Sequence, residues 1–365
     1  MDLVQFFLNL VVPPMGLFFL ALAWPPLTFM NACHWFLSFV FRENVRGKVV
    51  VVTGATSGIG EKLSYEYASH GAKLILVGNQ EGLLRDVAGK CQRIGAMDVR
   101  IVTADLGHEE ECKRFVEETV HQFGRCKFVV SGTSYFALNF LSVVDHLVNN
   151  AGIMHSYLFE EAVDVSSFQS IMDVTFWGSV YPTYYALPHL KRSGGKVVVN
   201  SSVSAWLPMP RLAIYNAAEA ALLNLFDTLR VEVGNSVGIT IATPGWVESE
   251  ITRGKFISAE GEHVTMPDLR DVTVGPVPVT YAEECAKAIF SGTVRGARYV
   301  RVPSWYGVTL LYRIFAPELI EWTYRLLFVS PAPGTQVPAA KLIMDVPGAK
   351  EILYPSSIVH PQKTE

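Results

Sequence analysis

Charge is scarce in this chain of 365 residues: Asp, Glu, Lys and Arg make up 18% of it, and apolar residues make up 50%. The formal net charge of -4 provides no basic face of the kind that nucleic-acid binding needs. The five cysteines include no Cys-x-x-Cys pair, which argues against a disulfide framework and favours a reducing compartment. The nine histidines form no pair at ligand spacing. We therefore expect no metal site and no nucleic-acid partner.

The longest uncharged stretch runs from Leu3 to Phe41 and contains no Lys, Arg, Asp or Glu. As one straight helix it would reach about 58 Å, which is roughly twice the ~30 Å hydrocarbon core of a bilayer. Two proline pairs, Pro13-Pro14 and Pro25-Pro26, interrupt it, and proline removes backbone donors from a helix. The stretch therefore predicts a bent hairpin that enters a lipid phase and returns.

Charges at the two ends of this stretch indicate its type and orientation. A secretory signal peptide would carry basic residues before its apolar core, but the only charged side chain there is Asp2. Arg42, Arg46 and Lys48 follow the stretch instead, which places the downstream domain on the cytosolic side. We predict that residues 1–45 anchor the protein to a lipid droplet or to the endoplasmic reticulum (ER) membrane. A simple signal anchor is the alternative, and a buried core helix is disfavoured by the length.

A glycine-rich turn follows a predicted buried strand at 49–53 and precedes a helical pattern that ends at Gly71. This order is the context that a phosphate-binding turn requires. Its glycines let the backbone approach a pyrophosphate, and the helix N-terminus supplies oriented N–H groups. The residues expected to bind the dinucleotide here are Gly54, Thr56, Ser57, Gly58, Ile59 and Gly60.

Strand and helix patterns alternate along the rest of residues 46–303. We expect strands at 73–77, 98–103, 145–149, 196–201, 237–243 and 298–302, and helices at 81–94, 109–123, 166–189 and 213–233. Such alternation is typical of an α/β fold with a doubly wound parallel sheet of the Rossmann type. Asp105 lies at the end of the third strand, where it could accept a bond from an adenine amino group.

Four motifs in the right order resemble those of the short-chain dehydrogenase/reductase family. They are TGxxxGxG from Thr53 to Gly60, NNAG at 149–152, Ser202 and Tyr215 thirteen residues apart, and Pro244-Gly245. The resemblance covers about residues 46–300. The chain is most similar to the plant steroleosin subgroup, which comprises lipid-droplet relatives of 11-beta-hydroxysteroid dehydrogenase. That closer match rests on the paired-proline anchor, WLPMPR at 206–211 and WYGVTLLYRIFAPE at 305–318.

The resemblance implies an oxidoreductase in which a nicotinamide cofactor carries the hydride. Tyr215 would exchange the substrate proton, and Ser202 would orient the substrate oxygen. It also implies cofactor contacts beyond the glycine turn, at Asn79, Asp105, Asn150, Ala151, Gly152, Tyr215, Glu219, Pro244, Gly245, Val247 and Ser249.

Two positions depart from the catalytic pattern of the family. A lysine normally follows the tyrosine by four residues and lowers its pKa, whereas this chain has Glu219 there. An ionised carboxylate would instead raise the pKa of Tyr215. Thr175 replaces the asparagine that helps to hold the water of a proton relay. Acid–base help of this type contributes about 10²–10⁴-fold, so we expect slowed turnover. In the alternative, Glu219 is a solvated helix residue of a site that no longer binds cofactor.

The choice between cofactors is not settled by the residues after the second strand. Related NADP-dependent enzymes place an arginine there, and NAD-dependent enzymes place an acidic residue. This chain reads Gly78-Asn79-Gln80, which carries neither charge. NADP is favoured because the resembling subgroup uses it, and NAD remains open.

Three further segments lie outside the motifs. Residues 126–144 form an apolar insertion before the fourth strand, either a real partner or membrane contact or an error in the gene model. Residues 304–330 predict an amphipathic helix that lies on lipid, packs on a second subunit of a homodimer, or covers the substrate cleft. The tail at 331–365 is expected to be flexible.

Two functions follow from this sequence. The first is a lipid-surface oxidoreductase of steroid metabolism that interconverts a hydroxyl and a ketone on a sterol-like molecule, impaired by the changes at Glu219 and Thr175. The second is a pseudoenzyme that serves the lipid droplet as a structural or binding protein.

Overall fold

The computed structural model describes residues 3–40, 42–123 and 144–360. They belong to two compact units, Met1–Asn44 and Val45–Glu365. The predicted insertion at 126–144 lies, except for Val144, outside the described residues.

The first unit is the helix α1 (Leu3–Val40), which continues through all four prolines. The predicted hairpin is therefore wrong. Each proline removes one ladder bond and bends the helix, but a reversal would leave many more backbone groups unpaired in apolar surroundings. The segment Val4–Cys33 has a mean hydropathy of 2.1 and none of its most apolar window is buried. By length and composition, this helix could cross a membrane.

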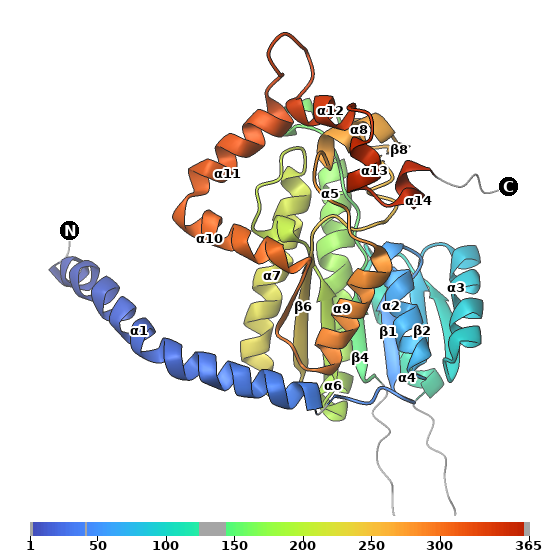
Figure 1. Cartoon of the computed structure of the whole chain (residues 1–365). Helices are drawn as coiled ribbons and strands as arrows, with labels where there is room; N and C mark the ends of the chain where they lie inside the picture. Colours follow the sequence, from blue (N-terminus) through green and yellow to red (C-terminus); the bar gives the residue numbers. More distant parts are fainter. Residues whose placement is uncertain (1–2, 41, 124–143, 361–365) are drawn as a thin grey trace, which may run out of the picture. The chain divides into compact units, whose positions relative to one another are not determined.

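The second unit is built on a parallel sheet of seven strands in the order β3-β2-β1-β4-β5-β6-β9 (Figure 1). The strands are β1 (Val49–Thr53), β2 (Lys73–Gly78), β3 (Asp98–Thr103), β4 (His146–Asn149), β5 (Lys196–Asn200), β6 (Gly238–Pro244) and β9 (Tyr299–Val302). The predicted doubly wound α/β fold is confirmed. The strand order reverses between β1 and β4, and ligands of such sheets bind beyond the strand ends at this switch point.

Helices cover both faces of the sheet. One face packs against α2 (Gly58–Ser69), α3 (Glu81–Ile94) and α9 (Ala282–Val294). The other packs against α4 (Glu109–Phe123), α6 (Gly178–Ser193) and α7 (Ala213–Val233). Successive residues of β1 alternate between the two cores, so that Val50 and Val52 lie in one and Val49 and Val51 in the other. This two-sided burial explains the continuous valine run of the strand.

The helix predicted at 166–189 is interrupted. It consists of α5 (Ser167–Met172), a π-helical turn η2 (Asp173–Trp177) and α6. Thr175 lies inside the π turn and is buried. Such turns occur preferentially at functional sites.

Residues 304–330 also form more than the one predicted helix. The short turn η4 (Ser304–Tyr306) leads into α10 (Gly307–Phe315), and α11 (Pro317–Tyr324) continues into the π turn η5 (Arg325–Val329). The break falls at Pro317, which is tolerated in the first turn of a helix but not in its interior.

The flexible tail predicted from residue 331 is wrong for residues 339–359. These form α12 (Ala339–Met344), α13 (Ala349–Leu353) and α14 (Ser356–Val359). Four buried side chains anchor them: Ala340, Met344, Tyr354 and Ile358. They pack beside α8 (Pro267–Thr273) and the hairpin of β7 (Lys255–Ile257) and β8 (His263–Thr265). The prolines and the polar end of this region resemble those of a disordered segment, which is why its sequence predicted a flexible tail.

An ion cluster holds the tail in place. Asp271 is 1% exposed and lies 2.6 Å from the Arg270 guanidinium and 2.5 Å from the Lys350 ammonium group. Arg270 and Asp271 belong to α8, whereas Lys350 belongs to α13, so the cluster links the two helices. A buried carboxylate needs such partners, because an unpaired charge in the interior is very unfavourable.

Candidate active site

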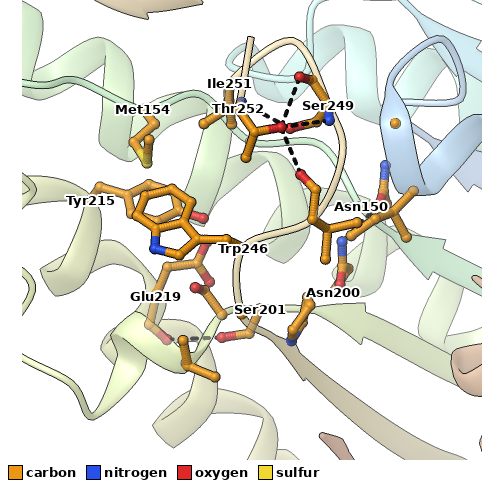
Figure 2. A pocket seen from close by; sticks show the side chains of 18 of the residues that line it. Asn150, Met154, Asn200, Ser201, Tyr215, Glu219, Trp246, Ser249, Ile251 and Thr252 are labelled. Carbon is orange, nitrogen blue, oxygen red and sulfur yellow. Dashed lines mark hydrogen bonds between the residues drawn. The ribbon is translucent and has the colours of Figure 1, made fainter. Parts of the chain in front are cut away.

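A pocket opens beyond the carboxyl ends of β1, β4, β5 and β6 (Figure 2). Its lining includes predicted residues from four separate motifs: Ser57, Gly58, Ile59, Asn150, Ala151, Gly152, Ser202, Tyr215, Glu219, Pro244, Gly245, Val247 and Ser249. The fold therefore brings the predicted motifs to one place.

The glycine turn is shaped by close contacts with the NNAG motif. Gly54 has φ +61°, and a Cβ atom there would lie 2.9 Å from the Cα atom of Ala151. A Cβ atom on Gly60 would lie 2.3 Å from the Nδ2 atom of Asn150. Only glycine fits both positions without displacing the backbone. Gly54, Thr56 and Gly60 do not line the pocket themselves, but the two glycines bring the backbone of this turn close to it.

Asn150 ties three strand ends together. Its Nδ2 atom donates to the carbonyl oxygen of Gly54 at 3.1 Å, and its N–H donates to Thr53 Oγ1 at 3.0 Å. Its Oδ1 atom accepts from Asn200 Nδ2 at 2.9 Å. These bonds fix the floor of the pocket relative to β1 and β5.

Two predicted contacts lie away from the pocket lining, near the ends of β2 and β3. Asn79 is exposed and directly follows β2. Asp105 is also exposed, and its Oδ1 atom accepts from the N–H of Gly107 at 3.0 Å. We expect this edge to hold the adenosine part of a dinucleotide whose other end reaches the pocket.

The catalytic candidates come from two elements. Tyr215 lies in the first turn of α7, and Glu219 lies one turn further along the same helix. Ser202 follows β5, and its Oγ atom accepts from the N–H of Ser204 at 3.2 Å. Tyr215 and Glu219 project into the same space in Figure 2, beside Ser201.

Burial and charge act together on the two titratable groups. Burial raises the pKa of Tyr215 well above its ordinary value, and the charge and hydrogen bond of Glu219 raise it further; a hydrogen bond with Ser202 opposes this. Burial also raises the pKa of Glu219 to about 7, against the opposing bonds from Tyr215 and Ser201. The sequence-based expectation that Glu219 would raise the pKa of Tyr215 agrees with this arrangement.

Glu219 is not a solvated helix residue. It is 3% exposed, and its Oε2 atom has no hydrogen-bond partner among the described residues. The alternative of a solvent-facing position is therefore wrong.

Thr175 lies behind the pocket wall. Its hydroxyl accepts from the N–H of Ile153 and donates to the carbonyl oxygen of the same residue, both at 3.2 Å. Its side chain is also the nearest neighbour of a Cβ atom built on Gly152. The Thr175 hydroxyl thus makes both of its hydrogen bonds with the backbone of Ile153, next to Gly152. Thr175 therefore positions that segment.

Several lining residues were not predicted from the sequence. An apolar wall consists of Met154, Met209, Leu212, Trp246 and Ile251, and the polar side adds Asn200, Ser201 and Thr252. Thr252 Oγ1 donates to the carbonyl oxygen of Val247 at 3.0 Å and accepts from the N–H of Ser249 at 2.9 Å. Their position in the sequence could have predicted some of them, because Asn200, Ser201 and Trp246 lie at or just after the ends of strands.

The sequence profile described as short chain dehydrogenase matches residues 48–259. The chain belongs to the short-chain dehydrogenase family. As a member of it, the protein is similar to plant relatives named 11-beta-hydroxysteroid dehydrogenase. That of Pinus massoniana is 52% identical over 90% of this chain and 88% of its own. The A form of Arachis hypogaea is 50% identical over 99% of both chains. The resemblance to the steroleosin-like subgroup is confirmed.

Solved structures of other short-chain dehydrogenases share the fold. One from Burkholderia phymatum, in complex with NAD, has a TM-score of 0.61 and 22% identity, covering 80% of this chain and 99% of its own. One from Burkholderia cenocepacia, in complex with NADP, has a TM-score of 0.59 and 20% identity, covering 77% and 99%.

The residues of this short-chain dehydrogenase fit a nicotinamide cofactor. The glycine turn leaves its backbone accessible at the start of the twelve-residue helix α2, where anionic groups are favoured. Among residues 3–40, 42–123 and 144–360, no donor reaches the buried Oε2 atom of Glu219, and ribose hydroxyls are donors of the kind it needs.

Proposed function

We propose that this protein is a lipid-surface oxidoreductase that interconverts a hydroxyl and a ketone on a sterol-like substrate. The observation that carries the proposal is the convergence of Ser202 and Tyr215 in one pocket with the NNAG segment and the glycine turn. The names of the plant relatives support the hydroxysteroid class of substrate.

In this proposal, different side chains of the pocket bind the substrate oxygen, exchange the proton and hold the cofactor. The hydroxyl groups of Ser202 and Tyr215 would hold the substrate oxygen by two hydrogen bonds, and Tyr215 would exchange the proton. A bound nicotinamide cofactor supplies the hydride chemistry. Gly58, Asn150 and Gly152 would hold that cofactor, and Ser249 would contact its carboxamide.

The apolar wall supports a large, weakly polar substrate. Met154, Met209, Leu212, Trp246 and Ile251 present no charge to the pocket. A sterol offers one or two oxygens on an otherwise apolar frame, and its burial against such side chains would contribute about 25 cal/mol per Å² of apolar area.

Two apolar surfaces support placement at a lipid surface. The first is α1, where nearly every side chain that the structure describes is exposed. The second lies on α10, where Val308, Leu311, Tyr312 and Phe315 form one stripe at helical spacing and are all exposed. Such a stripe normally faces a core, and on a protein surface it is suited to the headgroup region of a membrane.

Two more exposed apolar residues, Leu319 and Trp322, lie on α11, and Trp322 is 64% exposed. α10 is attached to the domain through Thr309, whose Oγ1 atom accepts from the indole N–H of Trp206 at 3.0 Å. The outward face is therefore available to lipid or to a second copy of the chain. We favour lipid because α1 brings the domain to it; the three basic residues after α1 would place the domain in the cytosol, on a lipid droplet or the ER.

NADP is the proposed cofactor, with NAD as the alternative. The support for NADP comes from the subgroup that the chain resembles, since Asn79 offers no charge to a 2′-phosphate. The Burkholderia structures contain one or the other cofactor and do not separate the two.

The second candidate function is a pseudoenzyme of the lipid droplet. It is favoured by Glu219, which raises the pKa of the tyrosine that must exchange a proton. In this case the pocket would still bind a cofactor or a sterol but would turn over neither.

The test titrates NADPH and NADH into the full chain in detergent or lipid, and follows nicotinamide fluorescence. The result we expect is saturable binding, oxidation of hydroxysteroids once NADP⁺ or NAD⁺ is supplied, and loss of that turnover in Tyr215→Phe. Binding without turnover by any hydroxysteroid would support the pseudoenzyme. Absence of binding by folded protein would contradict the oxidoreductase and favour a structural protein of the lipid droplet. Flotation with liposomes, compared with Leu311→Asp/Phe315→Asp, tests the lipid contact of α10.

A further inference from the structure

Glu219 is chemically isolated within the pocket. Of the residues that line it, Glu219 is the only one with a carboxyl or a basic group, and Tyr215 is the only other that titrates. The carboxyl is nearly completely buried, interacts with Tyr215 and Ser201, and leaves its Oε2 atom without a partner in the described part of the chain. A carboxylate in this position therefore has no counter-charge of its own.

The elements packed against this part of α7 supply no counter-charge either. β6, α5 and η3 contain no charged residue. The π turn η2 contributes one charged residue, Asp173, which is negative like Glu219. Its carboxylate accepts a hydrogen bond from Gln169. His155 accepts from the N–H of Ile214 at 3.2 Å, and burial lowers its pKa to about 4, so it is neutral at cellular pH.

The missing counter-charge can come from the cofactor. The oxidised nicotinamide ring carries a positive charge, and the reduced ring carries none. An ionised carboxylate in a water-poor pocket attracts the charged ring over several ångströms. A lysine in the same position would repel that ring, so the exchange of lysine for glutamate reverses the electrostatic preference of the pocket.

We propose that Glu219 is the proton acceptor of the oxidation of the substrate alcohol, and that it makes the pocket selective for oxidised nicotinamide. The inference rests on the proposed function. The hydroxyl proton of the substrate passes to Tyr215 Oη while the proton of Tyr215 passes to the Glu219 carboxylate. The hydride leaves the same carbinol carbon for the oxidised nicotinamide. The products are a ketone, a reduced cofactor and a neutral Glu219, so atoms and electrons balance.

This arrangement removes the difficulty posed by the high pKa of Tyr215. A free phenolate is never required, because the tyrosine gives up one proton as it receives another. What matters is the basicity of the final acceptor, and burial places the pKa of Glu219 at about 7. Proton acceptors are most effective when their pKa is close to the working pH.

The first test measures binding and needs no turnover. Dissociation constants for NADP⁺ and NADPH are determined for the full chain, for Glu219→Gln and for Glu219→Lys, at pH 6 and pH 8. We expect the wild-type chain at pH 8 to prefer the oxidised form by about tenfold more than Glu219→Gln does. This extra preference should shrink at pH 6, and Glu219→Lys should reverse it. Glu219→Gln is the matched control, because it keeps the shape and removes the charge.

A second measurement follows the carboxyl group itself. Infrared difference spectra of protein with ¹³C-labelled glutamate should show a protonated carboxyl band that titrates near neutral pH and is absent in Glu219→Gln. Binding of NADP⁺ should weaken this band, and binding of NADPH should not.

The possible outcomes distinguish a failure of this inference from a failure of the proposed oxidoreductase function. If both cofactor forms bind but their affinity ratio is the same in wild type and Glu219→Gln at both pH values, Glu219 does not act as proposed. The proposed oxidoreductase would then still stand on Ser202 and Tyr215. If neither form binds to any folded variant, the oxidoreductase function and the inference are overturned together.

Discussion

The two ends of the pocket differ in how closely their residues are packed and hydrogen-bonded. At the cofactor-phosphate end, Gly54 and Gly60 leave no space for a side chain, and Asn150 is bonded to its neighbours on both sides. At the proton-transfer end, Glu219 is buried with one oxygen unpaired, next to a tyrosine whose pKa it raises. The first end matches the family pattern, and the second departs from it.

The difference concerns what each end tolerates. A change at the glycine turn would collide with backbone atoms, so it would alter the fold as well as the site. A change at residue 219 leaves the helix intact and alters only charge and proton affinity. The chemistry of the pocket can therefore be altered at one end while the other still binds the same class of cofactor.

The largest expected effect comes from Tyr215→Phe. Removal of its hydroxyl takes away the group that exchanges the substrate proton, so kcat should fall by about 10²–10⁴-fold. The affinity for cofactor should change little, because the phosphate end is untouched. Steady-state kinetics together with a cofactor titration check this prediction. An equal loss of affinity would show that the two ends are coupled.

The next effect is on stability and depends on pH. The pKa of Glu219 is about 7 in the folded protein and about 4.5 in the unfolded chain, so the folded state holds a proton that the unfolded state loses. This group should make the protein less stable as pH rises from 4.5 to 7, by roughly 3 kcal/mol in total. Glu219→Gln should lack this slope. Urea unfolding of both proteins across this range tests it, and parallel curves would contradict the assignment.

The phosphate end is tested by Gly60→Ala. Its Cβ atom would lie 2.3 Å from the carbonyl oxygen of Gly54, and such overpacking costs about 1–3 kcal/mol. We expect lower stability and weaker binding of both cofactors. Gly82→Ala is the control: it lies in α3 with no atom within 4 Å of the added Cβ, and it should stabilise the helix by up to about 1 kcal/mol.

The smallest effect concerns the choice of cofactor. Asn79→Arg adds a cation at the exposed end of β2, where a 2′-phosphate would lie. We expect NADPH to bind about tenfold more tightly, as one charge-assisted bond allows, with NADH unchanged. Titrations at two salt concentrations check this, because the gain should shrink as salt screens the new charge.

Much of the second unit could be predicted because its signals are local and repeated. The strands β1 and β3 and the helices α3, α4 and α7 have the predicted bounds. Two-sided burial gives central strands such as β1 and β5 an apolar run, and α3 and α4 each have one apolar face. The family motifs then placed Ser202, Tyr215 and Glu219 in one pocket, which their separation in sequence alone does not establish.

The remaining features depend on contacts between distant segments. The break between α10 and α11 is an exception, because it falls at Pro317 and could have been predicted from that residue. The π turn at Thr175 has no such local signal. The burial of Tyr354 and Ile358 requires the loops after β6, which carry no periodic pattern. Trp246 and Met154 belong to the pocket wall only because the sheet brings their loops together. The course of α1 through its prolines depends on the apolar surroundings, which composition indicates only in part.

The cluster around Asp271 also ties the C-terminal helices to the part of the fold that supports the pocket wall. Its partner Lys350 and the buried residues Tyr354 and Ile358 lie within the last sixteen residues of the chain. Tyr354 and Ile358 pack in one apolar cluster with Met154, Leu212 and Trp246, which line the pocket. The substrate end of the pocket is therefore supported by a segment that lies far along the chain from the motifs of the cofactor end.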